Sequence, residues 1–387
     1  MDFTYSNEQL ALQETLQRFI GRDYGFDRRR ELARTALGFS ADAWARYAEL
    51  GLLALPFPEE VGGLGGNAVD IMLVMELMGR GLLLEPFLST IVMCGGLLRD
   101  AGPASLKGKI LQRMGAGELK LALACYEAAG RYDLSHIACT AVRSGAGWRL
   151  SGEKTVVLDA PSADYFLVSA RSSGHAGEPH GISVFLVARE AAGVSLFAYP
   201  TQSGGRAADV RLDGVAVDEA ALIGAAGDGL ALVERAVDRG IAALCAEAVG
   251  IMTALNEATL NYLKTRKQFG VPIGKFQALQ HRMADMFIAA EQARSMAVNA
   301  AVYADSSDIG ARRRAVSGAK AYIGQAARLV GQQAVQMHGA MGVVDELIVS
   351  HYFKRLTMID LSLGDTDYHL ARFSDMLAPS AAATTRS

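Results

Sequence analysis

Two carboxylates and an imidazole lie close together near the end of the chain, in the stretch LSLGDTDYH at residues 361–369. Asp365, Asp367 and His369 could donate and accept protons, so the stretch is a candidate for general acid–base chemistry. The alternative is that these residues form only the polar start of a last helix. Residue types and spacing leave both interpretations open.

Two more polar clusters lie near the expected ends of long helices. The first, TRKQFGVPIGKFQ at residues 265–277, places Arg266 and Lys267 just before a glycine and a proline. The second, QAVQMHGAMG at residues 333–342, ends in glycines that could turn backbone N–H groups toward an anion. Plain helix termination, with cations favoured near a C-terminus, is the alternative for both clusters.

The sequence contains no motif typical of a metal site, a disulfide framework, a serine nucleophile or a phosphate loop. The seven histidines show neither H-x-x-x-H nor H-E-x-x-H spacing, and the four cysteines form no C-x-x-C pair. A nucleophilic G-x-S-x-G turn is not found either. The glycine-rich VGGLGG at residues 61–66 follows no strand and precedes no G-K-[ST], which disfavours a phosphate loop. Metal, disulfide and serine-triad sites are therefore not expected.

Three regions of different periodicity must position the polar clusters. A helical period follows a Ser6/Gln9 pair that could form a capping box. The next region alternates with a period of two and breaks every eight to twelve residues, which predicts an antiparallel β-sandwich or barrel. Long proline-free helices then predict a four-helix bundle. The chain is thus expected to be mainly α with a central β domain, with boundaries at 1–117, 118–222 and 223–378 and a flexible tail at 379–387.

Composition limits the broad class of protein. The 387 residues carry a formal net charge of −3, and 51% of them are hydrophobic, so a basic nucleic-acid surface is not indicated. The N-terminus MDFTYSNEQL does not resemble a signal peptide, and no long uncharged apolar run is apparent. With unpaired cysteines, these features favour a cytoplasmic protein that neither leaves the cell nor spans a membrane.

The helix-end clusters, together with the order of helical, β and helical regions, resemble the acyl-CoA dehydrogenase family. The similarity covers nearly the whole chain and is carried by PEEVGGLGG at 58–66, RKQFGVPIGKFQ at 266–277 and QMHGAMG at 336–342. The Arg-x-Gln-Phe-Gly-x-Pro-Ile-x-x-Phe-Gln pattern is specific. Within the family, the chain is most similar to the small subunit of pimeloyl-CoA dehydrogenase, a type that works as a heteromer with a large subunit.

This resemblance implies an FAD-dependent oxidation of an acyl-CoA thioester to a trans-2-enoyl-CoA, in which a carboxylate removes the α proton and the flavin accepts the β hydride. It also implies that FAD lies at a subunit interface and that each subunit lends residues to its neighbour's FAD. Arg266 would bind the pyrophosphate with its fixed guanidinium. The expected FAD-binding residues of this lent portion are Arg266, Gln268, Phe269, Gln277, Gln336, Gly339 and Ala340, the last in place of a usual glycine.

The residues that would hold the chain's own flavin depart from the family pattern. The motif usually reading Thr-Glu-Pro-Gly-Ala-Gly-Ser-Asp is YEAAGRYD at residues 126–133, with bulky Tyr132 in place of a small hydroxyl. The Trp-Ile-Thr that packs on the flavin reads Val156-Val157-Leu158. Both changes remove hydrogen bonds or stacking that the isoalloxazine ring would use.

The catalytic glutamate is also missing from the positions where the family carries it. The usual Tyr-Glu-Gly-Thr aligns with SLGD at residues 362–365, so Leu363 stands in place of the base. The second family position, on a bundle helix, is Gly240, and the arginine often beside it is Ile241. The catalytic residue is therefore left unassigned.

Three other carboxylates remain as candidates for a relocated base: Glu247, Asp365 and Asp238. The alternative for each is a structural or solvated acid. Under that alternative, Asp365, Asp367 and His369 form a solvated start to the final helix, with Thr366 as its cap.

The expected partners are an acyl-CoA substrate, a large acyl-CoA dehydrogenase subunit in a heterotetramer or a homo-oligomer, and an electron-transfer flavoprotein. Nucleic acid, metal ions and membranes are not expected. Two alternatives stay open: a catalytically silent acyl-CoA-binding or scaffold homologue, and a self-sufficient homotetramer with a relocated base.

Overall fold

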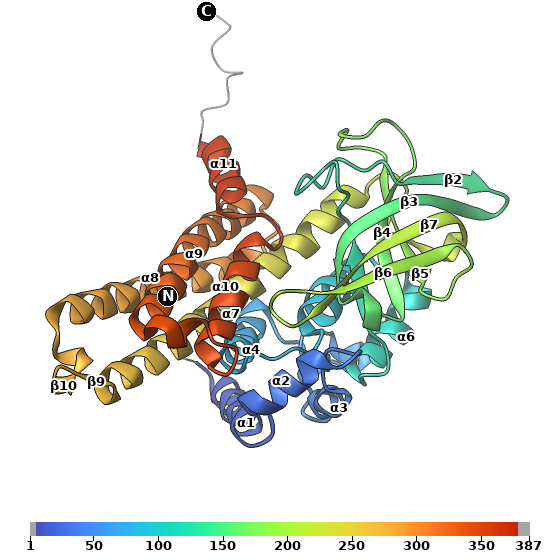
Figure 1. The fold of residues 1–387 in the computed structure, drawn as a ribbon. Coiled ribbons are helices and arrows are strands. Elements are labelled where there is room, and N and C mark those ends of the chain that lie inside the picture. Colours follow the sequence, from blue (N-terminus) through green and yellow to red (C-terminus); the bar gives the residue numbers. More distant parts are fainter. Residues whose placement is uncertain (1–4, 378–387) are drawn as a thin grey trace, which may run out of the picture. The chain divides into compact units, whose positions relative to one another are not determined.

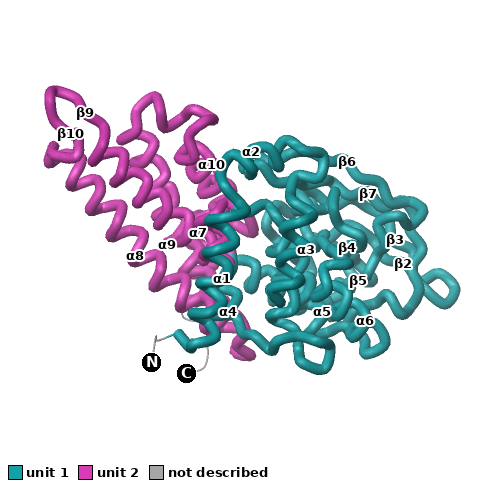
Figure 2. The backbone as a smooth tube through the Cα atoms, turned by 90° about the horizontal axis from the view of Figure 1, so that it is seen from below, with its two compact units in different colours: residues 1–74, 83–243 teal, residues 75–82, 244–387 magenta. Residues whose placement is uncertain are grey.

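A computed structural model describes residues 5–377 of the chain. It divides into two compact units, Met1–Val74 with Leu83–Ala243, and Met75–Leu82 with Leu244–Ser387 (Figure 2). The first unit contains most of the N-terminal helices and the large β-sheet, and the second contains the C-terminal helices. The predicted tail at 379–387 lies outside the described residues.

The N-terminal region is helical, as its periodicity predicts. The expected capping box is present, because the Ser6 hydroxyl accepts from the Gln9 backbone N–H at 3.2 Å and the Gln9 side chain accepts from the Ser6 N–H at 3.0 Å. The helices are α1 (Asn7–Asp23), α2 (Phe26–Arg34), α3 (Ala41–Glu49), α4 (Ala68–Gly81), α5 (Gly96–Ala101) and α6 (Ala104–Gly115), with short turns η1 (Leu52–Ala54) and η2 (Glu59–Val61) and the π-helix η3 (Leu88–Gly95).

The central region is one eight-stranded sheet made of two halves that one residue pair joins. Most of its strands are drawn in green in Figure 1. The strands are β1 (Leu121–Ala124), β2 (Thr140–Ser144), β3 (Gly147–Leu158), β4 (Tyr165–Arg171), β5 (Ile182–Ala188), β6 (Val194–Pro200), β7 (Arg206–Asp218) and β8 (Leu222–Ile223). Strands β6-β7-β3-β2 form one half and β1, β4, β5 and β8 form the other, joined where Thr140 pairs with Arg171. Turns η4 (Ala160–Ser162) and η5 (Glu219–Ala221) connect strands.

Buried side chains from both halves of the sheet form the core of this β region. Trp148 on β3 meets Phe185 on β5 edge to face, with ring centroids 5.3 Å apart. The sheet is mostly antiparallel, as predicted, but β1 runs parallel to β4 and the Thr140–Arg171 pair is also parallel. Parallel neighbours need a long connection, which local alternation of apolar residues cannot reveal.

The C-terminal region contains the long helices that the proline-free stretches predict. They are α7 (Gly229–Thr265), α8 (Gln277–Ala304), α9 (Ile309–His338), α10 (Ile348–Leu361) and α11 (Thr366–Leu377), with a hairpin of β9 (Lys267–Gln268) and β10 (Val271–Pro272) and short turns η6 (Ile273–Lys275) and η7 (Gly339–Val343). By length and composition, α7 could cross a membrane, and 83% of its most apolar window is buried in the fold. Its apolar residues therefore serve the core.

Glycines let two helices of the second unit touch through their backbones. A Cβ on Gly79 of α4 would lie 2.1 Å from the Glu247 carbonyl oxygen, and a Cβ on Gly250 of α7 would lie 1.8 Å from the Glu76 carbonyl oxygen. Only glycine fits either position. The contact fixes the turn of α7 that carries Glu247, one of the candidate carboxylates.

Candidate active-site loop and dinucleotide-binding end

The loop between α10 and α11 holds Leu363 in an unusual backbone conformation. Leu363 has φ +58° and Gly364 has φ +106°, and the Leu363 side chain is buried. A left-handed φ is uncommon for a residue with a branched side chain, so surrounding contacts must hold it. The position where the resemblance leads us to expect the base therefore holds a buried leucine on a tightly held loop.

A buried lysine, which sequence patterns did not single out, holds this loop. Lys320 of α9 is fully buried, and its Nζ donates to the Asp360 carbonyl at 2.8 Å and to the Gly364 carbonyl at 2.6 Å. Burial lowers the pKa of the Lys320 ammonium. The available signal was its place on the apolar stripe of α9, four residues after Val316 and three before Ile323.

The acids and the imidazole of the stretch at residues 361–369 have structural roles. Asp365 caps α11, because its Oδ1 accepts from the Tyr368 backbone N–H at 2.8 Å. The prediction that Thr366 is the cap is wrong, since the Thr366 hydroxyl donates to Asp360 Oδ1 at 2.7 Å. Asp367 is exposed, as expected of a solvated helix start.

His369 is fully buried, which corrects the prediction of a solvated imidazole. Its Nε2 lies 2.9 Å from the Leu363 carbonyl oxygen and its Nδ1 lies 3.3 Å from the Ser317 hydroxyl. Burial lowers the pKa of His369 to about 3, so the ring is neutral at ordinary pH. A neutral ring with Nε2–H donating to Leu363 satisfies both nitrogens. His369 therefore supports the loop as Lys320 does.

The candidates for a relocated base are engaged or buried. Both carboxylate oxygens of Glu247 accept from Arg355, at 2.5 Å from Nε and 2.7 Å from Nη2. Asp238 on α7 is fully buried, as is Ile241. A base must reach the substrate proton, whereas the carboxylates of Glu247 and Asp238 are buried.

The first half of the expected FAD-binding set lies where α7 ends. Arg266 and Gln268 are exposed, and Phe269, at the tip of the β9–β10 hairpin, is 91% exposed with φ +54°. Its ring meets the Phe276 ring edge to face, with centroids 6.1 Å apart. Gln277 begins α8 and is also exposed. Exposed cations can bind a phosphate group, and the exposed aromatic ring beside them can stack on a planar nucleobase.

The second half lies where α9 ends. Gln336, Gly339 and Ala340 are exposed, and Gly339 has φ +61° with open space where a side chain would stand. The two halves belong to the same unit, and Tyr262, two residues before the first half, stacks on His338 of the second half with ring centroids 4.4 Å apart. We call the surface formed by residues 264–277 and 336–343 the dinucleotide end.

The dinucleotide end fits the adenosine diphosphate part of FAD. Its charged residues are cations, and the groups that can meet a ligand are a guanidinium, amides, an aromatic ring and an open glycine turn. A guanidinium and backbone N–H groups can bind an anionic pyrophosphate, and an aromatic ring can pack on a neighbouring base. Its exposed cations are Lys264, Arg266, Lys267 and Lys275.

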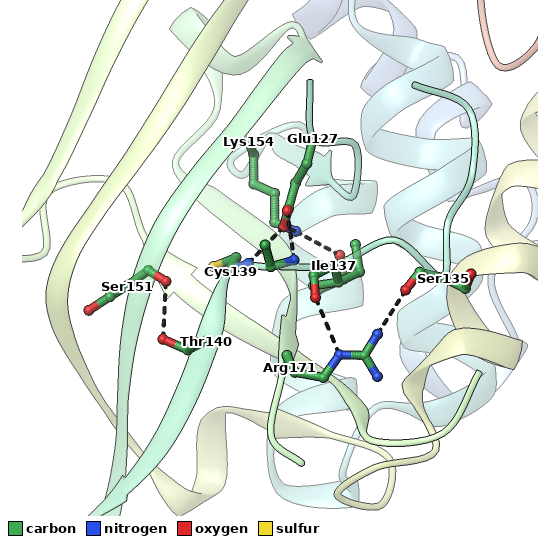
Figure 3. A network of polar contacts seen from close by, with 10 residues as sticks. Glu127, Ser135, Ile137, Cys139, Thr140, Ser151, Lys154 and Arg171 are labelled. Carbon is green, nitrogen blue, oxygen red and sulfur yellow. Dashed lines mark hydrogen bonds and ion pairs between the residues drawn. The ribbon is translucent and has the colours of Figure 1, made fainter. Parts of the chain in front are cut away.

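The β-domain loop at residues 126–133 keeps its support but not its ligand groups. Buried Glu127 accepts from Lys154 Nζ at 2.7 Å and from the backbone N–H groups of Ala138 and Cys139 at 2.7 and 3.0 Å (Figure 3). Arg131 is exposed with φ +49°, and Tyr132 is half-buried. The loop is therefore firmly anchored, while its family hydroxyl and proline positions carry other side chains.

The stretch Val156-Val157-Leu158 lies at an irregularity of the β3–β7 pairing. Val156 is 55% exposed with φ +51°, a strained conformation for a β-branched residue, and its N–H donates to Asp209 Oδ1 at 2.9 Å. Val157 is buried and Leu158 is half-buried. Neither an indole nor a hydroxyl is offered here to a flavin ring.

Two other predictions concern the glycine-rich loop and metal ions. The backbone N–H groups of Gly63, Gly65 and Gly66 donate to carbonyl oxygens of the same loop, and a Cβ on Gly63 would lie 2.0 Å from the Phe57 oxygen. These amides are thus used within the loop. Among residues 5–377, no three His, Cys, Asp or Glu side chains converge as metal ligands would.

Comparisons with known proteins agree over nearly the whole chain. Family models for the N-terminal, middle and C-terminal domains of acyl-CoA dehydrogenases match residues 6–118, 122–215 and 227–377. The chain is 28% identical over 384 residues to the probable acyl-CoA dehydrogenase YngJ of Bacillus subtilis, covering 95% of this chain and 97% of that protein.

Solved structures show the same likeness. The ChsE4-ChsE5 complex of Mycobacterium tuberculosis includes a chain with 27% identity and a TM-score of 0.89, covering 98% of this chain and 100% of that one. A variant of the Tcur3481-Tcur3483 steroid ACAD has 29% identity and a TM-score of 0.87, covering 97% and 99%. The chain belongs to the acyl-CoA dehydrogenase family, whose members are flavin oxidoreductases that use FAD and act on CH–CH groups.

Proposed function

We propose that the chain is the small subunit of a heteromeric acyl-CoA dehydrogenase and lends its dinucleotide end to an active site whose catalytic glutamate belongs to a large subunit. The observation that carries this proposal is a contrast within one unit. The dinucleotide end is assembled and exposed, whereas the loop that aligns with the family's base is closed around Leu363. A subunit with only a scaffold role would have no use for the first feature.

FAD supplies the hydride acceptor for the α,β-oxidation. The residues of this chain would bind and orient its adenosine diphosphate part. Arg266 would pair with the pyrophosphate, Gln268 and Gln336 would add neutral donors, and Phe269 would cover an apolar face. These groups exclude water and hold the cofactor, but none of them moves the substrate proton.

The heteromeric part of the proposal has support from relatives. The ChsE4-ChsE5 and Tcur3481-Tcur3483 proteins are each named for two chains. We place this chain with the small subunit of pimeloyl-CoA dehydrogenase, so the substrate would be a dicarboxylic or medium-length acyl-CoA. The Tcur3481-Tcur3483 protein is described as a steroid ACAD, so a steroid substrate is a second possible class. Electrons would pass to an electron-transfer flavoprotein, and the enzyme would work in the cytoplasm.

A self-sufficient homotetramer has less support. It needs a carboxylate that can reach the substrate, and Glu247 and Asp365 already hold Arg355 and the start of α11. A silent acyl-CoA-binding homologue would keep the fold but would not need Arg266 on the surface.

Substitution of Arg266 tests the proposal in the oligomer purified with its partner chain. Arg266→Ala removes a charge-assisted pair, so FAD should bind roughly ten- to hundredfold more weakly. Arg314→Ala is the matched control, because Arg314 is an exposed arginine near the start of α9 and lies outside the dinucleotide end. Fluorescence titration of the apoprotein with FAD gives both affinities. Equal FAD affinity in the two variants would contradict the proposal.

A further inference from the structure

The two parts of the dinucleotide end are far apart in sequence. A tertiary contact must therefore hold them at a fixed distance from each other. One part follows α7, which ends at Thr265, and the other follows the end of α9 at His338, with the whole of α8 between them in the sequence. Within the second unit, the Tyr262 ring lies on the His338 ring with centroids 4.4 Å apart and planes 27° apart. This stack holds the last turns of α7 against the end of α9.

Each ring lies beside a residue of the FAD-binding set. The Arg266 backbone N–H donates to the Tyr262 carbonyl at 2.8 Å, so Tyr262 is on the helical turn that supports Arg266. His338 is the last residue of α9 and immediately precedes Gly339, whose φ of +61° turns the chain into η7. A shift of either ring would therefore move a ligand-binding residue.

The His338 ring is held in one orientation. It is buried, and its Nδ1 lies 2.8 Å from the Ala334 carbonyl oxygen, so Nδ1–H donates to that oxygen. Burial lowers the pKa of His338, which keeps the ring neutral. The hydrogen bond keeps the neutral His338 ring in one orientation, so the Tyr262 ring can stack on it.

A second contact reinforces the same junction. Arg282 Nη1, near the start of α8, donates to Gln333 Oε1 on α9 at 2.7 Å. Arg282 is exposed, so water competes for this hydrogen bond more than it does for the stack of half-buried Tyr262 on buried His338. We therefore expect the Tyr262–His338 stack to contribute more than the Arg282–Gln333 hydrogen bond.

We propose that Tyr262 and His338 are positioning residues that set the distance between the two parts of the dinucleotide end. The inference rests on the proposed function, because it concerns the FAD-binding surface that the chain lends. Neither ring needs to touch FAD. Their role is to hold Arg266 and the Gly339 turn at the separation that one dinucleotide requires.

Four variants separate positioning from general stability. Tyr262→Leu removes the ring, and Tyr262→Phe keeps it without the hydroxyl. Tyr303→Leu is a matched control, because Tyr303 is a partly exposed tyrosine (38%) at the far end of α8. Arg266→Ala reports on the proposed function itself. Each variant is measured for amide hydrogen exchange of η7, for the urea midpoint of the chain, and for FAD affinity of the oligomer.

Loss of the Tyr262 ring should affect only η7 and FAD binding, and a phenylalanine ring should be enough to prevent the effect. Tyr262→Leu should speed η7 exchange and weaken FAD binding by roughly three- to tenfold each, with the urea midpoint little changed. Tyr262→Phe should restore both values, and Tyr303→Leu should alter neither. Arg266→Ala should weaken FAD binding while η7 exchange stays as in the unaltered chain.

Two outcomes overturn the inference, and a third overturns only the proposed function. If Tyr262→Leu leaves η7 exchange and FAD binding unchanged while Arg266→Ala loses FAD, the rings do not position the site. If Tyr262→Leu lowers the urea midpoint as strongly as it speeds η7 exchange, the stack is merely structural. If Arg266→Ala binds FAD normally, the proposed function fails, and η7 exchange still decides whether the rings fix the two parts.

Discussion

Replacing Glu247 with glutamine separates a structural carboxylate from a catalytic one. Glu247 is buried, and both of its oxygens accept from Arg355, at 2.5 and 2.7 Å. In Glu247→Gln, an amide N–H₂ would face a guanidinium N–H, so one contact becomes repulsive and Arg355 loses its counter-charge. The side chain of Arg355 keeps 25% of its surface exposed, which moderates the loss.

The expected magnitude follows from these exposures. Breaking a fully buried ion pair costs about 3–5 kcal/mol, and water at Arg355 should reduce this to about 2–3 kcal/mol. Urea unfolding of the chain should therefore show a clear fall in midpoint. Glu291→Gln is the matched control, because Glu291 is half exposed and lies 3.8 Å from Arg294. It should cost less than about 0.5 kcal/mol.

The assay that completes this test is turnover of the oligomer per bound FAD. Glu247→Gln should keep turnover within about twofold of the unaltered enzyme, since a structural acid takes no part in proton transfer. A catalytic base would show the reverse pattern. Unchanged stability together with a loss of turnover of about a hundredfold or more would refute the reasoning and favour the self-sufficient homotetramer.

Three other substitutions test the supports of the two units. Gly324→Ala would place a Cβ 2.2 Å from Thr366 Oγ1 and 2.3 Å from Asp360 Oδ1, so it should cost about 1–3 kcal/mol in urea unfolding, whereas Gly310→Ala, with its nearest atom at 3.4 Å, should not. His369→Gln removes a buried histidine whose pKa is lowered to about 3. Below pH 6.5 the unfolded state binds a proton that the folded state does not, so the stability advantage of the unaltered chain over His369→Gln should shrink by about 2 kcal/mol between pH 7 and pH 5. A constant difference would show that His369 titrates normally. Lys154→Met leaves Glu127 buried without its ammonium and should cost about 3–5 kcal/mol, part of which Glu127→Gln in the same chain should recover.

The helices could be predicted because their signals are local. Proline-free apolar periodicity indicates long helices in the region of α7, α8 and α9, and the Ser6/Gln9 capping box marks the start of α1. The parallel contact of β1 with β4 could not be predicted in this way, since it depends on where a distant segment returns.

The roles of polar residues in the loop at residues 361–369 were harder to predict. Asp365 and Thr366 are both good capping residues, and only the Asp360 side chain, which accepts from Thr366, decides which of them caps α11. His369 lies against Ser317, 52 residues earlier in the sequence, and Lys320 of the same helix holds the loop that the His369 ring contacts. Local chemistry cannot supply such long-range partners.

The flavin content of the chain, purified alone and with its partner, tests the central claim most directly. A visible spectrum and an acyl-CoA turnover assay are recorded for both preparations. We expect little flavin and no turnover for the chain alone, and a full FAD complement with turnover for the complex, because in the proposed function this chain lends its dinucleotide end and the partner supplies the base. Full flavin occupancy and turnover by the chain alone would contradict it.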